Sequence, residues 1–317
     1  MKLGKVTLVI LCLTSVFLAC NKDDGGNDIT FEERDRTEQQ ASDKDSLTDY
    51  LQSHYYNSGA FVSNPNPSLA DLIIEILPED GVLPDPDNNT LLIDAVETHQ
   101  TVFRETDYEY YILRLNQGGG SDSPTFADDV RTNYIGSLLD DEVFDSTVNP
   151  INLDLTQVIP GWALVFPEFN VAESFAENSD GTIDYMNYGL GVMYLPSGLG
   201  YYANAQNKIP AYSPLIFQIE LFATSLNDHD SDGVPSYLED LNGDGFFTID
   251  VDEITDTTDD DTDDNNILDY VDIDDDGDGV PTINEDIDGD GDPTNDIGAN
   301  GIPKYLDIDE TESNLDN

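Results

Sequence analysis

The sequence predicts an α+β protein in which a β-rich central part is followed by an acidic region without regular hydrophobic periodicity. Short runs of alternating apolar residues indicate half-buried strands, and turns rich in glycine or aspartate separate them. The only tryptophan, Trp162, follows a glycine, where a short buried helix or the floor of a pocket is expected. The end of the chain has a different chemistry, because residues 228–317 contain 32 acidic residues and one basic residue, Lys304. We therefore expect two or three domains in these 317 residues.

Four runs predict the strands of the central part. A triple glycine at 118–120 follows the first run, and an acidic turn at 139–142 joins the second to the third. In the third run Ile151, Leu153 and Leu155 alternate with polar residues, as expected for a strand with one buried face. The predicted strands cover residues 110–115, 130–138 and 215–223, together with the alternating stretch that contains residues 151, 153 and 155.

The first 19 residues have the features of a targeting segment. Two lysines precede an apolar run that is too short to span a bilayer. The run ends at Leu18-Ala19-Cys20, which resembles a bacterial lipoprotein processing site, so we expect residues 1–19 to be removed and Cys20 to carry lipid, including palmitate. The alternative is an ordinary secretory signal with an incidental cysteine. The lipid on Cys20 and a polar tether at 20–30 would place the protein in the outer membrane, facing the periplasm or the cell surface.

Charge and cysteine content exclude several classes of protein. The net charge is −56 and only 11 residues are Lys or Arg, so no basic surface for nucleic acid can form. The two cysteines are Cys12 and Cys20, which leaves the mature chain without an internal disulfide, a catalytic thiolate or a cysteine zinc site. Residues 31–106 carry weak patterns, and we expect a helical N-terminal arm and support region. A solvated spacer is the favoured interpretation of this arm, and a dimerisation arm is the alternative.

Three motifs in the central part carry a resemblance to a known family. They are VFDS at 143–146 leading to VIPGW at 158–162, LPSGLGY at 195–201, and IPAYSPLIF at 209–217. In this order they resemble the signature of the FKBP-type peptidyl-prolyl isomerases. The resemblance implies that residues 107–225 form a five- or six-stranded antiparallel sheet wrapped around one short helix that begins near Trp162.

The resemblance also implies an activity that needs no cofactor. Rotation about a peptide bond is opposed by about 18–20 kcal/mol, and a dry apolar cup that binds the twisted X–Pro amide more tightly than the planar one lowers this barrier. Asp145 would orient the substrate at the rim, the Ile159 N–H would bind the substrate carbonyl, and the Tyr201 hydroxyl would donate. The residues carried over to the cup and its rim are Tyr134, Phe144, Asp145, Ile151, Val158, Ile159, Trp162, Tyr201 and Phe217.

The expected function is therefore that of a folding helper, or chaperone, for exported or surface proteins that contain proline. Two departures from the family pattern bear on activity. Ile151 and Leu153 stand where the family commonly has aromatic residues, and the segment 163–189 is long enough to contain an insertion near the rim. The alternatives are a non-catalytic surface module that holds a proline-containing peptide or a partner, and a calcium-dependent adhesion protein.

Residues 226–317 contain a second set of motifs, D-x-D-x-D-G and its variants, with the ligand spacing of an EF-hand calcium loop. Prolines two residues after the turn glycine, as at Pro235 and Pro281, do not suit the leaving helix of an EF-hand. The phrases around them resemble thrombospondin type 3 repeats, which implies structural calcium; the alternative is a disordered acidic tail. The candidate ligands are Asp228, Asp230, Asp232 and Glu239; Asp274, Asp276, Asp278 and Glu285; Asp261, Asp263, Asn265 and Asp272; Asp296, Asn300 and Asp307; Asp240, Asn242 and Asp244; and Asp286, Asp288 and Asp290.

Overall fold

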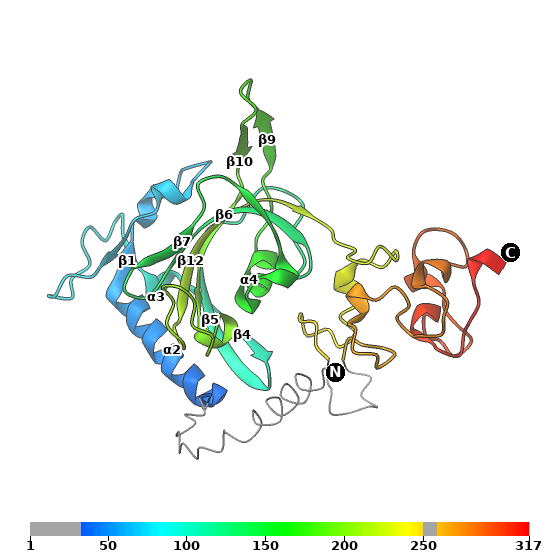
Figure 1. Ribbon diagram of the computed structural model, residues 1–317. Coiled ribbons are helices and arrows are strands. Elements are labelled where there is room, and N and C mark those ends of the chain that lie inside the picture. The colour runs from blue at the N-terminus through cyan, green and yellow to red at the C-terminus, as the bar shows by residue number, and fades with distance from the viewer. Residues whose placement is uncertain (1–32, 250–258, 317) are drawn as a thin grey trace, which may run out of the picture. The chain divides into compact units, whose positions relative to one another are not determined.

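The computed structural model describes residues 33–249 and 259–316 (Figure 1). The expected signal peptide, the lipidation site Cys20 and the tether at 20–30 lie outside the described residues. From Arg34 onward the chain forms one unit. In the part of the chain that is described, no helix has both the length and the apolar character needed to cross a membrane.

One antiparallel sheet dominates the structure, in the order β4-β5-β11-β12-β6-β7, with β8 also paired to β6. The predicted α+β class is confirmed, but the sheet has seven strands where five or six were expected. The additional edge strand, β4, lies in the expected support region and extends the sheet beyond the predicted start at residue 107. The strands are β4 (Glu97–Phe103), β5 (Thr106–Asn116), β6 (Asp129–Ser137), β7 (Val143–Ser146), β8 (Ile151–Asp154), β11 (Gly189–Leu195) and β12 (Leu215–Ser225).

The two faces of the sheet are covered by different helices. Along β11 the side chains alternate, so that Met193 and Leu195 belong to one hydrophobic cluster and Val192 and Tyr194 to another. The first cluster includes Trp162 and other residues of the short helix α4 (Pro160–Val165) and the turn that follows it. The predicted helix near Trp162 is therefore present, and it begins at a proline, whose fixed φ suits the first turn.

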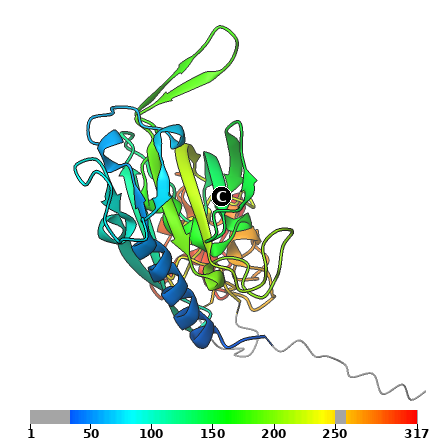
Figure 2. The ribbon, with the colours of Figure 1, turned by 90° about the vertical axis from the view of Figure 1, so that its left-hand side faces the viewer.

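The second cluster is built on helix α2 (Arg36–Ser53), which runs along the other side of the sheet (Figures 1 and 2). Leu47 and Leu51 are fully buried, and Tyr50 is nearly so. Asp43 is also buried and accepts hydrogen bonds from the Ser197 N–H and hydroxyl, at 2.8 and 2.6 Å. The expectation of a solvated spacer is therefore wrong for this helix, because Leu47, Tyr50 and Leu51 belong to a hydrophobic cluster and Asp43 is buried with hydrogen-bond partners.

Smaller elements surround the main sheet. A three-stranded sheet of β1 (His54–Tyr56), β2 (Ile74–Ile76) and β3 (Thr90–Leu91) follows α2, and α3 (Leu92–Ala95) connects it to β4. The hairpin of β9 (Ser174–Glu177) and β10 (Ile183–Met186) projects from the main sheet in both views (Figures 1 and 2). The 3₁₀ helices are η1 (Ser58–Ala60), η2 (Leu69–Asp71), η3 (Leu155–Gln157), η4 (Phe166–Glu168), η5 (Ser197–Leu199), η6 (Ser236–Leu238), η7 (Asp269–Val271), η8 (Thr282–Asn284), η9 (Pro293–Asn295), η10 (Lys304–Leu306) and η11 (Asn314–Asp316).

The acidic region consists of loops joined by single 3₁₀ turns. The turns η6, η8 and η10 each begin directly after a proline, which agrees with the prediction that no EF-hand helix follows the loops. The sixth residue of the two strongest motifs, Gly233 and Gly279, has φ of 102° and 95°, a conformation that favours glycine. The region contacts the central domain through aromatic side chains, since the rings of Phe246 and Phe103 lie 4.7 Å apart.

Candidate active site and calcium loops

A cavity of about 670 Å³ opens beside α4, within the size range of small-molecule pockets. Its walls come from β6, β7, β8, β12 and the residues around α4, so the sheet and its short helix both shape it. Most of the wall is apolar or aromatic, and the polar groups lie among residues of loops and strand ends. The lining residues are Tyr134, Phe144, Asp145, Leu153, Gln157, Val158, Ile159, Pro160, Trp162, Tyr201, Gln206, Asn207, Ile209 and Phe217.

Four aromatic rings pack edge to face around the cavity. The Trp162 ring lies 5.1 Å from Phe217 and 5.0 Å from Tyr134, at interplanar angles of 86° and 78°. Phe144 meets Phe217 at 5.5 Å and 83°. Edge-to-face contacts at these distances are the favoured arrangement of aromatic pairs, so the walls are fixed by their own packing. Trp162 and Phe217 are only 4% and 3% exposed, which keeps water from the inner end of the cavity.

Polar groups lie at the rim. The Tyr134 hydroxyl donates to Asp145 Oδ2 at 2.5 Å. Burial, followed by the hydrogen bond to Asp145, raises the pKa of Tyr134 above its usual value, and burial together with the charge of Asp145 does the same for the pKa of Tyr201. Both phenols therefore remain protonated hydrogen-bond donors at neutral pH. The Ile159 N–H has no acceptor among the described residues, so it is free to bind a carbonyl oxygen of a substrate.

Eight of the nine predicted cup and rim residues line the cavity, and Ile151 does not. Ile151 begins β8, where it pairs with Thr132. Leu153, two residues further along β8, is the residue of this strand that reaches the cavity. The alternating pattern identified the strand and its face, but the pattern alone does not show how far along the strand the cavity extends.

Several lining residues were missed by the sequence argument. Gln206 and Asn207 come from the loop before the third motif, Ile209 is the first residue of that motif, and Gln157 precedes the Val158-Ile159 pair. Gln157 lies directly beside a motif and Ile209 lies within one, so their positions offered a signal, whereas the 206–207 loop offered none. Gly136 was also missed: a Cβ there would come within 2.6 Å of the Phe144 ring and 2.8 Å of the Phe217 ring. A glycine at this position on β6 therefore makes room for two of the aromatic walls.

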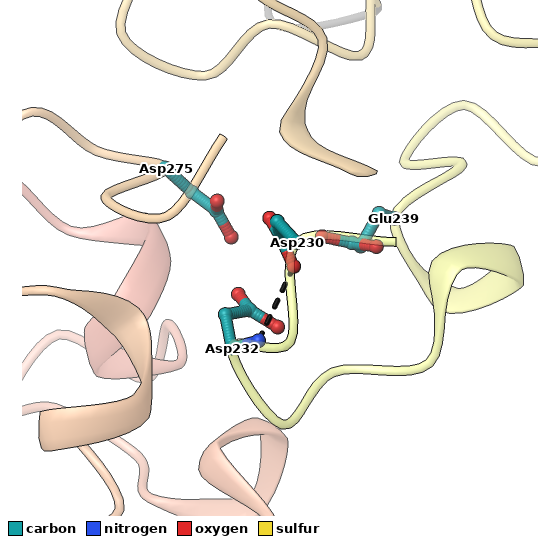
Figure 3. A group of neighbouring side chains, drawn as sticks. All are labelled: Asp230, Asp232, Glu239 and Asp275. Atoms are coloured by element: carbon teal, nitrogen blue, oxygen red, sulfur yellow. Dashed lines mark hydrogen bonds between the residues drawn. The ribbon is translucent and has the colours of Figure 1, made fainter. Parts of the chain in front are cut away.

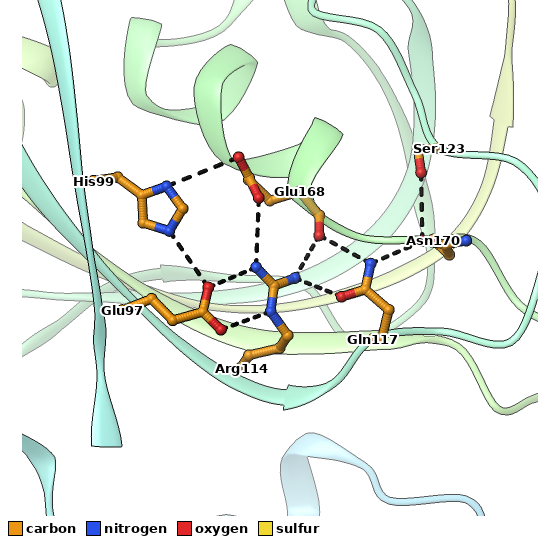
Figure 4. Close-up of polar contacts among 7 residues, drawn as sticks. All are labelled: Glu97, His99, Arg114, Gln117, Ser123, Glu168 and Asn170. Carbon is orange, nitrogen blue, oxygen red and sulfur yellow. Dashed lines mark hydrogen bonds and ion pairs between the residues drawn. The ribbon is translucent and has the colours of Figure 1, made fainter. Parts of the chain in front are cut away.

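A polar network holds the turn after α4 against the sheet (Figure 4). The Arg114 guanidinium on β5 donates from Nε and Nη2 to the two carboxylate oxygens of Glu97 on β4, at 2.9 and 2.7 Å. Its Nη1 donates to the Glu168 carbonyl of η4 and to Gln117 Oε1. The hydrogen bonds and charge of Arg114 lower the pKa of Glu97. Through these contacts Arg114 connects η4, and with it the helix α4 that carries Trp162, to the edge strand β4.

The long segment 163–189 does not line the cavity, although its Phe166 packs against Trp162 at 5.4 Å from behind the wall. None of its residues lines the wall, and its hairpin instead contacts the far end of β12, where Tyr185 stacks on Phe222 at 4.6 Å. The predicted insertion therefore contributes no residue to the cavity wall, and its effect on substrates or partners stays a prediction. Phe175 on the hairpin is 69% exposed.

In the acidic region, three groups of carboxylates converge in the described residues (Figure 3 shows the first). The first group contains Asp230, Asp232 and Glu239 of the predicted first loop, together with Asp275, which was not predicted. Asp228 is not part of it; its carboxylate accepts from the Ser231 and Gly233 N–H groups. The other two groups each come from one loop: Asp274, Asp276 and Asp278, and Asp286, Asp288 and Asp290.

The remaining predicted ligands do not form such groups in the described part of the chain. Glu285, predicted with the second group, is fully buried with both carboxylate oxygens unpartnered but is not part of that group. In two of the weaker loops, asparagine amides donate to the aspartate at the end, as Asn265 does to Asp272 and Asn300 to Asp307. The predicted carboxylate ligands that do not converge with two others are Asp228, Asp240, Asp244, Asp261, Asp263, Asp272, Glu285, Asp296 and Asp307. The asparagines Asn242, Asn265 and Asn300 stay predicted ligands.

Burial perturbs the carboxyl groups of the first group. Loss of water, followed by the charge of Asp232, raises the pKa of Glu239 to about 10. Loss of water, followed by the charge of Asp269, raises the pKa of Asp275 to about 11. A carboxyl group whose pKa is raised by folding favours the folded state only while it is protonated. Without a cation, the acidic region therefore loses stability as pH rises from the unfolded pKa values toward these higher ones.

The fold and the cavity together define an isomerase-like domain, and comparison with known proteins agrees. A family model described as FKBP-type peptidyl-prolyl cis-trans isomerase matches residues 120–222. A second, described as BamM C-terminal, matches residues 229–288. FK506-binding protein 1 of Eremothecium gossypii is 32% identical over 115 residues, which are 35% of this chain and 88% of that protein. The chain belongs to the FKBP-type peptidyl-prolyl cis-trans isomerase family.

Bacterial relatives match over a smaller share of their length. The FKBP-type isomerase FkpA of Aeromonas hydrophila is 30% identical over 131 residues, which are 40% of this chain and 42% of that protein. The chain thus spans less than half the length of this relative. The solved structure of a peptidyl-prolyl isomerase from Pseudomonas syringae overlaps with a TM-score of 0.34 and 17% identity, covering 61% of this chain and 98% of the other.

Proposed function

We propose that the protein is a peptidyl-prolyl cis-trans isomerase acting on proline-containing polypeptides, and that it serves as a folding helper for exported or surface proteins. The observation that carries the proposal is the aromatic cavity, in which Trp162, Phe217 and Tyr134 pack edge to face beneath a rim with hydrogen-bond donors. Family membership supports the same reaction.

The reaction needs a surface that prefers the twisted amide. In the planar state the X–Pro bond is polarised by resonance and well solvated; in the twisted state its carbonyl has lost charge and water stabilises it less. The apolar walls exclude water and accept the prolyl ring, while the Ile159 N–H holds the neighbouring carbonyl. Binding the twisted form more tightly than the planar one lowers the barrier without a nucleophile or a proton transfer.

A protease-coupled assay on X–Pro peptides tests the proposal. We expect the mature chain, residues 21–317, to accelerate isomerisation and the Trp162→Ala and Asp145→Ala variants to lose most of that turnover. Circular dichroism of each variant must show an intact fold, since Trp162 also packs in the core. If the wild type binds the peptides but does not accelerate their isomerisation, the proposed enzymatic activity is wrong and the non-catalytic binding module is favoured.

We also propose that the acidic region binds structural calcium in the manner of thrombospondin type 3 repeats. Calcium takes six to eight oxygen ligands, and the converging carboxylates of the three groups offer such ligands. Buried carboxylate oxygens without hydrogen-bond partners at Asp232, Asp276 and Glu285 fit a bound cation. Chelation should change the circular dichroism of the acidic region and leave peptide turnover nearly unchanged. An identical circular dichroism spectrum with calcium and with chelator would refute the proposal that calcium stabilises the acidic region.

The location of the protein is a separate proposal. The LAC sequence at 18–20 supports lipid attachment at Cys20 and anchoring in the outer membrane, with the protein facing the periplasm or the cell surface. Labelled palmitate should enter the wild type, and Cys20→Ser should abolish both labelling and sedimentation with membranes. Persistent labelling of Cys20→Ser would contradict this site.

A further inference from the structure

The first carboxylate group joins two loops that are distant in sequence. Asp230, Asp232 and Glu239 lie in the loop 228–239, directly after β12, whereas Asp275 lies in the loop 274–285. One oxygen from each of the four carboxylates lies within 4.8 Å of the others. Figure 3 shows the four side chains converging from separate stretches of chain. The other two groups each use residues of a single loop.

Burial distinguishes this group from a solvated acidic patch. Glu239 is 0% exposed and Asp275 is 1% exposed. All four oxygens of these two carboxylates are buried and lack a hydrogen-bond partner among the described residues. Asp230 Oδ2 and Asp232 Oδ2, which belong to the same group, also lack one. Carboxylates withdrawn from water in this way are stable only when a cation or several donors compensate them.

Among the described residues, the lysine and the histidine of the acidic region have other partners. Lys304 is the only lysine or arginine in residues 228–317, and its ammonium group lies 3.2 Å from both Glu310 and Glu312. The ring of His229 is occupied by Ser236 at 2.8 Å and by Asp154 at 3.2 Å. Without a cation these carboxylates are stable in the folded state only when they are protonated, so a bound ion is the compensating charge that would allow them to be ionised.

Asp275 lies between two ligands of a different group. Asp274 and Asp276 converge with Asp278, and the turn that contains them is closed by the Gly277 N–H donating to the Asp274 carbonyl at 3.1 Å. Within this turn the side chain of Asp275 leaves the loop's own group and joins Glu239 instead. Three consecutive aspartates thus contribute to two separate groups.

We propose that Asp275 completes a calcium site with Asp230, Asp232 and Glu239, so that one ion ties the loop after β12 to the loop 274–285. This inference rests on the proposed calcium binding of the acidic region and names one ligand and one role that the loop motifs do not give. Four carboxylates can supply up to eight hard oxygens, which suits calcium. Zinc would prefer nitrogen or sulfur ligands, and magnesium a compact octahedron that keeps several waters.

Calcium stoichiometry of the full mature chain tests the proposal. Isothermal titration of residues 21–317 with calcium should show one ion fewer in Asp275→Asn than in the wild type, since the amide keeps the volume but removes the charge. The matched control is Asp264→Asn, which removes the same charge from an exposed residue outside the three groups and should bind as many ions as the wild type.

Double variants separate a lost site from a lost fold. Glu239→Gln should lose the same ion as Asp275→Asn, and the two together should lose no more than either alone, because both act on one site. Asp278→Asn should lose a different ion, so that its combination with Asp275→Asn loses two. Global unfolding of the acidic region in Asp275→Asn would instead remove every ion, and it would leave Asp278→Asn with no further effect.

The outcomes distinguish this inference from the broader one. If the wild type binds no calcium, the proposed calcium region fails and this site fails with it. If the wild type binds calcium and Asp275→Asn binds as many ions with the same affinity, only the shared site is overturned. Loss of two ions in the Asp275→Asn, Glu239→Gln double variant would also overturn it, since the residues would then serve separate ions.

Discussion

At the scale of single residues, the cavity rim depends on one short hydrogen bond. Tyr134 belongs to the aromatic wall, and its hydroxyl also fixes Asp145 at 2.5 Å. The phenol thus links an apolar surface to the charged group that would orient a substrate. Because the bond lies at an exposed rim, its loss affects the position of Asp145 more than the stability of the fold.

We expect Tyr134→Phe to lower kcat/KM by about fivefold, the equivalent of roughly 1 kcal/mol for a hydrogen bond, with almost no change in Tm. The matched control is Tyr188→Phe, which removes a comparable bond, from the hydroxyl to Glu220 Oε1 at 3.1 Å, away from the cavity. Equal losses of turnover in both variants would show that Asp145 does not need the Tyr134 hydroxyl.

A second residue predicts a pH effect on stability. Asp43 on α2 is buried against Ser197, and loss of water raises its pKa, an effect that hydrogen bonds from Ser197 and Gln39 and the charge of Arg34 partly offset. The folded state therefore holds this proton to a higher pH than the unfolded state does. The resulting stability is present at low pH and is lost as pH rises through the raised pKa.

The Asp43→Asn variant isolates this effect, because it cannot titrate. In saturating calcium, urea unfolding should show the stability of the wild type, relative to the variant, falling as pH rises from about 4 toward neutrality. Contributions from other carboxylates cancel in the difference. A difference that grows with pH would mean that the folded Asp43 is a stabilised anion instead.

At the scale of elements, the Arg114 network fastens η4 to the sheet edge and so supports α4. We expect Arg114→Met to reduce the free energy of unfolding by about 1–2 kcal/mol, since the ion pair is partly exposed but bidentate. Lys44→Met is the control: its pair with Glu109 is a single contact at 3.0 Å and the lysine is 50% exposed. Lys44→Met should change the free energy of unfolding by no more than about 0.5 kcal/mol. An equal effect of both variants would contradict the supporting role of Arg114.

Shortening the β9–β10 hairpin tests whether this hairpin contributes to turnover at the cavity. Replacing residues 176–184 by Asn-Gly keeps the Phe175–Tyr185 pair and closes it with a tight turn. Turnover of short X–Pro peptides should remain within about twofold of the wild type, because no hairpin residue lines the cavity. A tenfold loss in kcat/KM would show that the hairpin shapes the site from a distance.

The sequence predicted those strands that carry clear runs of apolar residues. β5, β6 and β12 each carry a buried apolar face, so their positions were predicted to within a few residues. β4 was missed because it is a polar edge strand with mostly exposed residues. The packing of α2 was missed because Asp43 is buried through hydrogen bonds from Ser197 that only the tertiary structure supplies.

The cavity was more predictable than the carboxylate groups, because its residues lie in motifs that are local in sequence. The aromatic cup follows motifs that lie close together in sequence, so all its predicted residues except Ile151 line the cavity. The calcium loops were predicted as separate units from local spacing. The convergence of Asp275 with carboxylates of another loop depends on how the loops pack and has no local signal.

At the scale of the whole molecule, the net charge of −56 creates a negative potential around the cavity. Peptides with lysine beside the X–Pro bond should therefore be turned over about three to ten times faster than those with glutamate at low ionic strength. Raising the salt to about 0.5 M should remove most of the difference, because screening then acts within a few ångströms. Calcium must be held constant, and a ratio unaffected by salt would point to local contacts instead.

The carboxylate of Asp154 contacts both the isomerase domain and the acidic region. Asp154 Oδ1 accepts from the Thr156 N–H and hydroxyl and so caps η3, the turn that leads to Val158 and Ile159. Its Oδ2 lies 3.2 Å from His229, inside the first loop of the acidic region. A substitution at Asp154 should consequently lower both peptide turnover and the affinity of the proposed calcium loop. Measuring only one of these two quantities would not identify the shared cause.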